Sequence, residues 1–97
     1  MHITIRRYKT DSPKEVTRIV NERWFPLIKK IAGFVAYYGI ETGEGGWASV
    51  SVFETPAGAE ESNRVAAEFV KNNPNLARLI KSKPEVIAGS VGAHKTK

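Results

Sequence analysis

The stretch Gly33–Thr55, GFVAYYGIETGEGGWASVSVFET, has the pattern of two β-strands joined by a glycine-rich turn. Alternate residues of a strand point to opposite faces of its sheet. In the first strand one face is predicted to carry Phe34, Ala36, Tyr38 and Ile40, and the other Val35 and Tyr37. In the second strand one face is predicted to carry Ala48, Val50 and Val52, and the other Trp47, Ser49, Ser51 and Phe53. Because apolar or aromatic residues occur on both faces of both strands, both sides of the sheet need cover.

The length of the chain limits where that cover can come from. A chain of 97 residues is expected to form one domain, residues 1–97, with a single two-layer core. Such a domain has enough helix to cover only one side of its sheet. The other side would expose apolar surface on the order of several hundred Å², which monomers rarely do. The sequence therefore predicts a homodimer in which two copies pair through their bare sheet faces.

Before the hairpin, the sequence predicts one strand and one helix. Residues 3–9 have a strand pattern, and the segment Ser12-Pro13-Lys14-Glu15 has the spacing of a capping box with proline at the first helical position. Apolar residues then recur at helical spacing, so a helix is expected over residues 13–31. Pro26 lies inside this range and is expected to kink or split the helix.

After the hairpin, Thr55 and Pro56 repeat the cap-then-proline pattern and predict a second helix over residues 57–71. The segment 72–75, Asn-Asn-Pro-Asn, breaks this helix, and residues 85–94 form the last predicted strand. The order is β-α-β-β-α-β, and right-handed crossovers place both helices on one face of a four-stranded antiparallel sheet. The predicted fold class is therefore α+β and ferredoxin-like. Within the hairpin, Glu44, Gly45 and Gly46 are expected to supply the positive φ angles of the turn.

Composition excludes several classes of function. The chain has no cysteine, which removes disulfides, thiol nucleophiles and thiolate metal sites. It shows neither a signal-peptide pattern nor a long apolar run, so a soluble cytoplasmic protein without membrane contact is expected. The formal charge of +5 is scattered rather than clustered. RNA-recognition domains share the element order, but their third strand carries stacking aromatics where this chain has Ser49 and Ser51, so no nucleic-acid partner is predicted.

The whole chain, about residues 2 to 95, resembles the antibiotic biosynthesis monooxygenase-like family of dimeric α/β barrels. The resemblance rests on the predicted helix end at Ile31-Ala32-Gly33-Phe34, the aromatic hairpin, and the exit Ser51-Val52-Phe53-Glu54-Thr55 into an alanine-rich helix. It implies a ferredoxin-like domain that forms a dimeric α/β barrel. The same barrel carries cofactor-free oxygenases, haem-degrading enzymes, isomerases and stress-related proteins, so the motifs indicate the fold more strongly than the activity.

In the oxygenases of this family, the deprotonated phenolic substrate itself passes an electron to O₂, so no cofactor and no metal are expected. Such a site needs a dry aromatic pocket, a polar group that favours the phenolate and a donor for the oxygen intermediate. The resemblance implies catalytic roles for Trp47 and Asn63. Candidate substrate-binding residues are Tyr37, Phe53, Ser62, Trp24 and Arg23. Haem is not expected, because the helix predicted over residues 57–71 contains no histidine ligand.

Each candidate also has a purely structural interpretation. The aromatic residues of the hairpin either line a pocket between the helices and the sheet or fill the dimer core. Asn63 and Ser62 lie on a helix arc that should be apolar, so they bind either a ligand or the local backbone. Arg23 either meets an anionic substrate or keeps its head group in water. The alternative function is a non-catalytic dimer that binds a small ligand or takes part in a stress response.

Overall fold

A computed structural model describes residues 1–97, and its four strands form one antiparallel sheet in the order β2-β3-β1-β4. The strands are β1 (His2–Lys9), β2 (Phe34–Gly43), β3 (Gly46–Phe53) and β4 (Glu85–Ser90). Two consecutive strands form the outer hairpin, and β1 lies between β3 and β4. This is the ferredoxin-like arrangement that the sequence predicts, although β4 ends at Ser90 rather than at residue 94.

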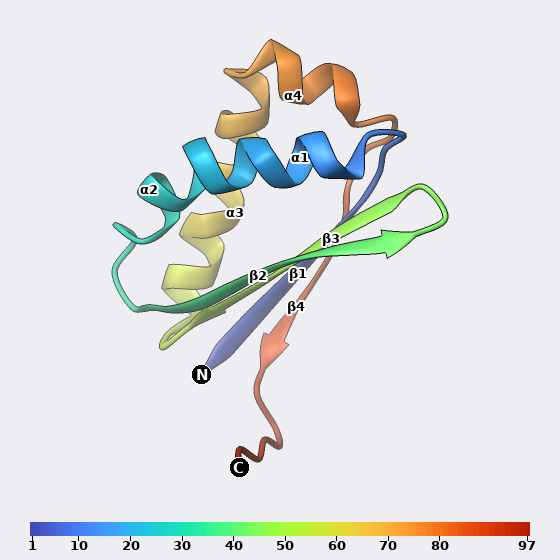
Figure 1. Ribbon diagram of the computed structural model, residues 1–97. Coiled ribbons are helices and arrows are strands. Elements are labelled where there is room, and N and C mark those ends of the chain that lie inside the picture. The colour runs from blue at the N-terminus through green and yellow to red at the C-terminus, as the bar shows by residue number, and fades with distance from the viewer.

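All the helices lie on one side of this sheet and leave its other side bare (Figure 1). They are α1 (Pro13–Ile19), the π-helix η1 (Val20–Trp24), α2 (Phe25–Ile28), α3 (Pro56–Lys71) and α4 (Pro74–Leu79). No helix of the chain is both long enough and apolar enough to cross a membrane. The core lies between the helices and the sheet, and its most enclosed large side chain is that of Phe53.

The first helical segment is split just before Pro26, which is one of the two outcomes predicted for the helix over residues 13–31, but it is shorter than predicted. It ends at Ile28, and the backbone N–H of Phe25 donates to the carbonyl of Val20, a five-residue step that defines the π-helix. Pro26 follows directly and has no N–H to donate to the preceding turn. The widened turn therefore precedes the proline, and it directs Trp24 into the core, where the side chain is 4% exposed.

The two predicted helix starts have different outcomes. At α3 the Thr55 side chain accepts a hydrogen bond from the backbone N–H of Gly58 at 3.2 Å, which confirms this cap. At α1 the capping-box prediction is wrong, because the Ser12 side chain makes no capping hydrogen bond. Glu15 instead pairs with Arg18, and the backbone N–H of Ser12 donates to Thr10 Oγ1 at 3.0 Å. The Glu15 carboxylate thus pairs with Arg18 on the helix surface instead of accepting from the backbone N–H of Ser12.

The β2–β3 hairpin contains two details that strict alternation does not predict. Positive φ angles occur at Gly43, Glu44 and Gly45, not at Gly46. The pairing register also shifts between Phe34 and Ala36, as in a β-bulge. Phe34 therefore contacts Phe53 on the helix side, with ring centroids 5.9 Å apart, and the prediction that Phe34 shares a face with Ala36 is wrong.

Beyond the bulge, strand register separates the two faces of the sheet. The four β3 residues that were predicted to share one face all lie on the helix side of the sheet. All four are buried: Trp47, Ser49, Ser51 and Phe53. The bare side carries a row that crosses all four strands: Tyr38, Val50, Ile5 and Ile87. Tyr38 and Ile87 are 62% and 59% exposed, so this face is apolar and uncovered in the isolated chain.

Candidate functional site

A small, mostly apolar cavity lies between the helices and the covered face of the sheet. Its walls are mostly apolar or aromatic and combine residues of the sheet, the first helical segment, α3 and the α4 region: Arg6, Tyr8, Val16, Val20, Trp24, Tyr37, Trp47, Ser49, Ser51, Ser62, Ala66, Phe69, Val70, Leu76 and Ile80. Its volume is about 40 Å³. That is room for two or three water molecules. An aromatic ring therefore enters only if lining side chains move.

Trp47 forms the wall of this cavity nearest the hairpin turn. Its side chain is 2% exposed and packs against Tyr8, with ring centroids 6.4 Å apart. The indole also covers Gly39 of the neighbouring strand, where an added Cβ would lie 2.6 Å from the ring. The glycine thus provides the space that the indole occupies. Because the side chain points toward the helices, Trp47 is a cavity wall rather than part of the bare sheet face.

A chain of hydrogen bonds holds the Trp47 indole in this orientation. Trp47 Nε1 donates to Thr17 Oγ1 at 3.0 Å, and Thr17 Oγ1 donates to Glu41 Oε2 at 2.7 Å. Lys14 Nζ pairs with Glu41 Oε1 at 2.8 Å. The Lys14 ammonium, and after it the Thr17 hydroxyl, lower the pKa of the Glu41 carboxyl. The carboxylate on β2 therefore links α1 to the indole on β3.

This link predicts the behaviour of a Thr17→Val variant, which preserves side-chain shape but removes the hydroxyl. The buried indole N–H then loses its acceptor, and we expect the free energy of unfolding to fall by about 1–3 kcal/mol. Urea unfolding followed by circular dichroism measures the change. Thr42→Val is the matched control, because its hydroxyl bonds only to the neighbouring Gly43 carbonyl on the exposed turn. Equal losses in the two variants would contradict the link.

A second polar cluster lies on the sheet wall of the cavity, around the side chain of Arg6 on β1. The Arg6 side chain is buried, and the residue is only 8% exposed. Its Nε donates to the Tyr8 hydroxyl at 2.8 Å, and its Nη1 donates to Asn63 Oδ1 at 3.1 Å. Thr4 Oγ1 donates to the same Asn63 oxygen at 3.1 Å. Asn63 on α3 therefore binds two side chains of β1.

Tyr37 and two serines complete the sheet wall. Ser51 pairs with Tyr37 of β2, and Ser49 pairs with Arg6 of β1. Burial raises the pKa of the Tyr37 phenol, and the neighbouring Ser49 side chain offsets this only in part. Tyr37 is therefore a neutral hydroxyl at neutral pH. The wall thus presents hydroxyl groups and one guanidinium to a cavity whose other walls are mostly apolar.

The opposite wall is built by aromatic side chains from two helical elements. Trp24 of the π-helix contacts Phe69 of α3 with ring centroids 5.2 Å apart, and it contacts Tyr37 at 6.3 Å. Ser62 also lines the cavity, but its hydroxyl donates to the Ala59 carbonyl at 2.6 Å. The π-turn is therefore the local feature that brings the Trp24 indole to the site.

The structure brings together most of the residues singled out from sequence. Trp47, Tyr37, Trp24 and Ser62 line the cavity, and Asn63 adjoins it through Arg6. Phe53 is fully buried in the core but does not line the cavity. Its ring lies beneath Gly58 at the start of α3, so it supports the fold of the site rather than its surface.

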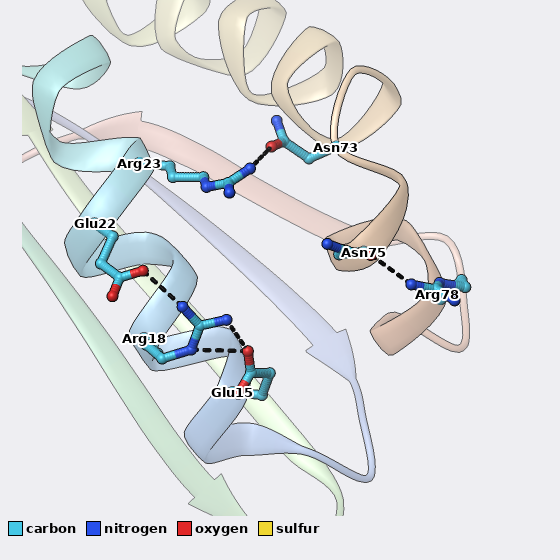
Figure 2. A network of polar contacts seen from close by, with 7 residues as sticks. All are labelled: Glu15, Arg18, Glu22, Arg23, Asn73, Asn75 and Arg78. Carbon is cyan, nitrogen blue, oxygen red and sulfur yellow. Dashed lines mark hydrogen bonds and ion pairs between the residues drawn. The ribbon is translucent and has the colours of Figure 1, made fainter.

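Arg23 does not reach the cavity. Its Nη1 donates to Asn73 Oδ1 at 3.3 Å on the outer surface, where it joins the first helical segment to the α3–α4 turn (Figure 2). In the same view, Arg18 pairs with Glu15 and Glu22 along the exposed side of α1 and η1. The guanidinium of Arg23 therefore stays in water with a polar partner and does not line the cavity.

Arg6 is the cavity residue that sequence reasoning missed. The signal is present in the alternation of β1, where Thr4, Arg6 and Tyr8 share the face that carries the helices. An arginine at such a position is unusual, because charged residues are seldom buried without a partner. The same alternation leaves Arg7 on the bare face, where it is exposed.

Comparison with solved structures identifies the class of fold. A monooxygenase from Streptomyces coelicolor, ActVA-Orf6 in complex with nanaomycin D, matches with a TM-score of 0.78 and 9% identity over 99% of this chain and 91% of that chain. SnoaB, a cofactor-independent oxygenase from Streptomyces nogalater, matches with a TM-score of 0.74 and 12% identity over 99% and 97%. The structural neighbours are thus antibiotic biosynthesis monooxygenase-type proteins, and this chain shares their fold.

Other neighbours have different properties. MhuD, in a form with two manganese protoporphyrin IX groups per active site, matches with a TM-score of 0.77 and 10% identity over the whole of both chains. A dimeric ferredoxin-like protein from an uncultured marine organism matches with a TM-score of 0.67 and 11% identity, also over the whole of both chains. No protein-family model matches the sequence, and no curated protein matches it significantly.

The two histidines of this chain lie outside the cavity. His2 is at the start of β1, where its ring is 3.5 Å from the Ser90 hydroxyl, and His94 is exposed near the end of the chain. Helix α3 contains no histidine. A porphyrin is also far larger than a cavity of about 40 Å³. The cavity residues therefore do not fit a haem group.

Proposed function

We propose that this protein is a cofactor-independent monooxygenase-like protein that binds a small aromatic or quinone-like compound in the cavity beside Trp47. The observation that carries the proposal is the composition of the cavity walls. Aromatic and aliphatic side chains form most of the lining, and the polar groups come mainly from the sheet, with Ser62 of α3 as the exception. Ligand sites for small organic molecules combine apolar walls with a few fixed polar groups in this way.

The walls also suit the chemistry that such an oxygenase performs. Conversion of a phenol to a quinone by O₂ places one oxygen atom on the ring and releases the other as water, so the substrate supplies all the electrons. The protein then has only to favour the phenolate, exclude water and bind the reacting oxygen. We assign Trp47 to the wall that contacts the ring. We assign Asn63, through Arg6, to the polar side of the site.

The size of the cavity adds a condition to the proposal. Sites that enclose organic ligands usually have volumes of about 300–1,000 Å³, whereas this one has about 40 Å³. A one-ring or two-ring ligand therefore has to displace side chains of the helical wall. The π-helix is the segment best suited to this movement, because it interrupts the regular hydrogen bonding between α1 and α2.

Oxygen uptake with 1-naphthol and a panel of hydroquinones tests the enzymatic part of the proposal. We expect enzyme-dependent uptake that falls about 10- to 100-fold in Trp47→Phe and in Asn63→Ala. Asn75→Ala is the matched control, because the Asn75 side chain lies outside the cavity lining and hydrogen-bonds to Arg78 on the surface of α4. If no substrate stimulates uptake, and if neither Trp47→Phe nor Asn63→Ala alters the binding of any panel compound, the enzymatic proposal is wrong.

A non-catalytic ligand-binding protein is the second candidate function. The observation that favours it is the small volume of the cavity, which as it stands holds water-sized molecules and no ring. Binding of a panel compound without oxygen uptake would support this candidate over the first. Uptake that depends on Trp47 would contradict it.

We also propose that the protein works as a homodimer paired through the bare face of its sheet. The row Tyr38, Val50, Ile5 and Ile87 supports this proposal, because monomers rarely expose an apolar face of this kind. Light scattering at micromolar concentration is expected to give twice the chain mass of 10.7 kDa. A stable mass of 10.7 kDa would contradict the dimer.

A further inference from the structure

Arg6 is a buried cation without an anionic partner. No ion pair of the chain includes it. No aspartate, glutamate, lysine or histidine lines the cavity into which it faces, and the titratable neighbours there are the phenols of Tyr8 and Tyr37. Buried charges in proteins are normally paired, because an uncompensated charge in an apolar environment is strongly destabilising.

The hydrogen bonds of Arg6 show which of its donors remain free. A guanidinium has five N–H groups in a planar fork. The N–H of Nε and one N–H of Nη1 are used by Tyr8 and Asn63, and Nη2 makes no hydrogen bond within the chain. Every fully enclosed side-chain polar atom has a partner, so Nη2 must reach accessible space. Because Arg6 lines the cavity, this free edge of the fork is the part of the side chain that a ligand in the cavity would reach.

We propose that Arg6 makes the cavity selective for the anionic form of an aromatic ligand, a phenolate rather than the neutral phenol. This inference rests on the proposed function and assigns the preference for the phenolate to one residue, Arg6. The free Nη2 and the remaining N–H of Nη1 donate to the phenolate oxygen. The aromatic walls formed by Trp24 and Trp47 contact the ring.

Two neighbours fix the direction of the fork. Asn63 Oδ1 accepts from both Arg6 and Thr4, so its carbonyl oxygen is already occupied and does not contact the ligand. Tyr8 accepts from Nε at 2.8 Å on the other edge. Asn63 is therefore a positioning residue that acts through Arg6. The Tyr37 phenol stays neutral because burial raises its pKa, so it does not neutralise the guanidinium.

The probe that tests this selectivity is 4-nitrophenol, whose absorbance reports its own protonation and whose phenol titrates near neutral pH. Its methyl ether, 4-nitroanisole, has nearly the same shape but cannot ionise. We expect the protein to lower the pKa of bound 4-nitrophenol by one unit for each tenfold preference for the phenolate. We expect 4-nitroanisole to bind about 10- to 100-fold more weakly than the phenolate.

Variants assign the selectivity to Arg6. In Arg6→Met, which keeps an apolar stem in the same space, we expect the pKa shift of the probe to disappear and its affinity at pH 8 to fall about 10- to 100-fold. Arg6→Lys keeps the charge and is expected to retain part of the shift. Arg78→Gln removes an exposed charge from α4 and is expected to leave the shift unchanged. Circular dichroism verifies that each variant is folded.

The outcomes separate this inference from the proposed function. If both probes bind to the wild-type protein with equal affinity, and the pKa of 4-nitrophenol is unchanged or raised, the anion selectivity is wrong while the ligand site stands. If neither probe binds, the proposed ligand site itself is wrong. The wild-type measurement decides this even if Arg6→Met fails to fold.

Discussion

Replacing Gly39 with alanine is expected to displace the Trp47 indole and to lower the free energy of unfolding by about 1–3 kcal/mol. A Cβ at this position would lie 2.6 Å and 2.8 Å from two atoms of the indole ring. The ring cannot swing away freely, because it is buried and its N–H is bonded to Thr17. Any movement is therefore toward the cavity, and it breaks the hydrogen bond to Thr17.

Two measurements check this expectation. Urea unfolding gives the change in stability, and tryptophan fluorescence in a Trp24→Phe background reports the environment of the Trp47 indole alone. Gly92→Ala is the control, because Gly92 lies just after β4 and an added Cβ there meets nothing within 4 Å. We expect the control to change stability by less than about 0.5 kcal/mol. If Gly39→Ala behaves like the control, the indole is not confined as described.

The element order could be predicted from sequence because local signals marked nearly every boundary. The Thr55-Pro56 pair began α3 as expected, and the glycines of the hairpin turn allowed the positive φ angles that close it. These signals act within a few residues, so a single sequence contains them. The π-helix and the bulge after Phe34 could not be predicted in the same way. Both depend on how Trp24 and Phe34 pack against the finished core.

The site could be predicted as far as alternation along a strand and spacing along a helix determine which way a side chain points. Alternation along β3 placed Trp47 on the same face as Ser49, Ser51 and Phe53, but it did not determine whether this face lies against the helices. That choice depends on long-range packing. Asn63 was singled out as a polar residue on an apolar arc, yet its partner Arg6 lies 57 residues away. The charge of Arg6, taken alone, indicates exposure, so its burial could not be predicted from the sequence.

Replacing Val50 with lysine is expected to convert the proposed dimer into a monomer. Val50 lies near the middle of the bare face, where Tyr38 flanks it on one side and Ile5 on the other. In a symmetric dimer each interface contains the substitution twice. Two ammonium groups in an apolar interface without partners cost several kcal/mol each. The mass from light scattering should therefore fall to 10.7 kDa.

The same variant should keep its fold, because in a monomer the lysine at position 50 extends into water from a face that no helix covers (Figure 1). Circular dichroism is expected to be unchanged, while thermal stability falls through loss of the partner. Ala67→Lys adds the same charge to an exposed position on α3 and is expected to remain dimeric. A dimeric Val50→Lys variant would show that the copies pair elsewhere, because a lysine in the middle of the sheet face is incompatible with close contact between two apolar sheets.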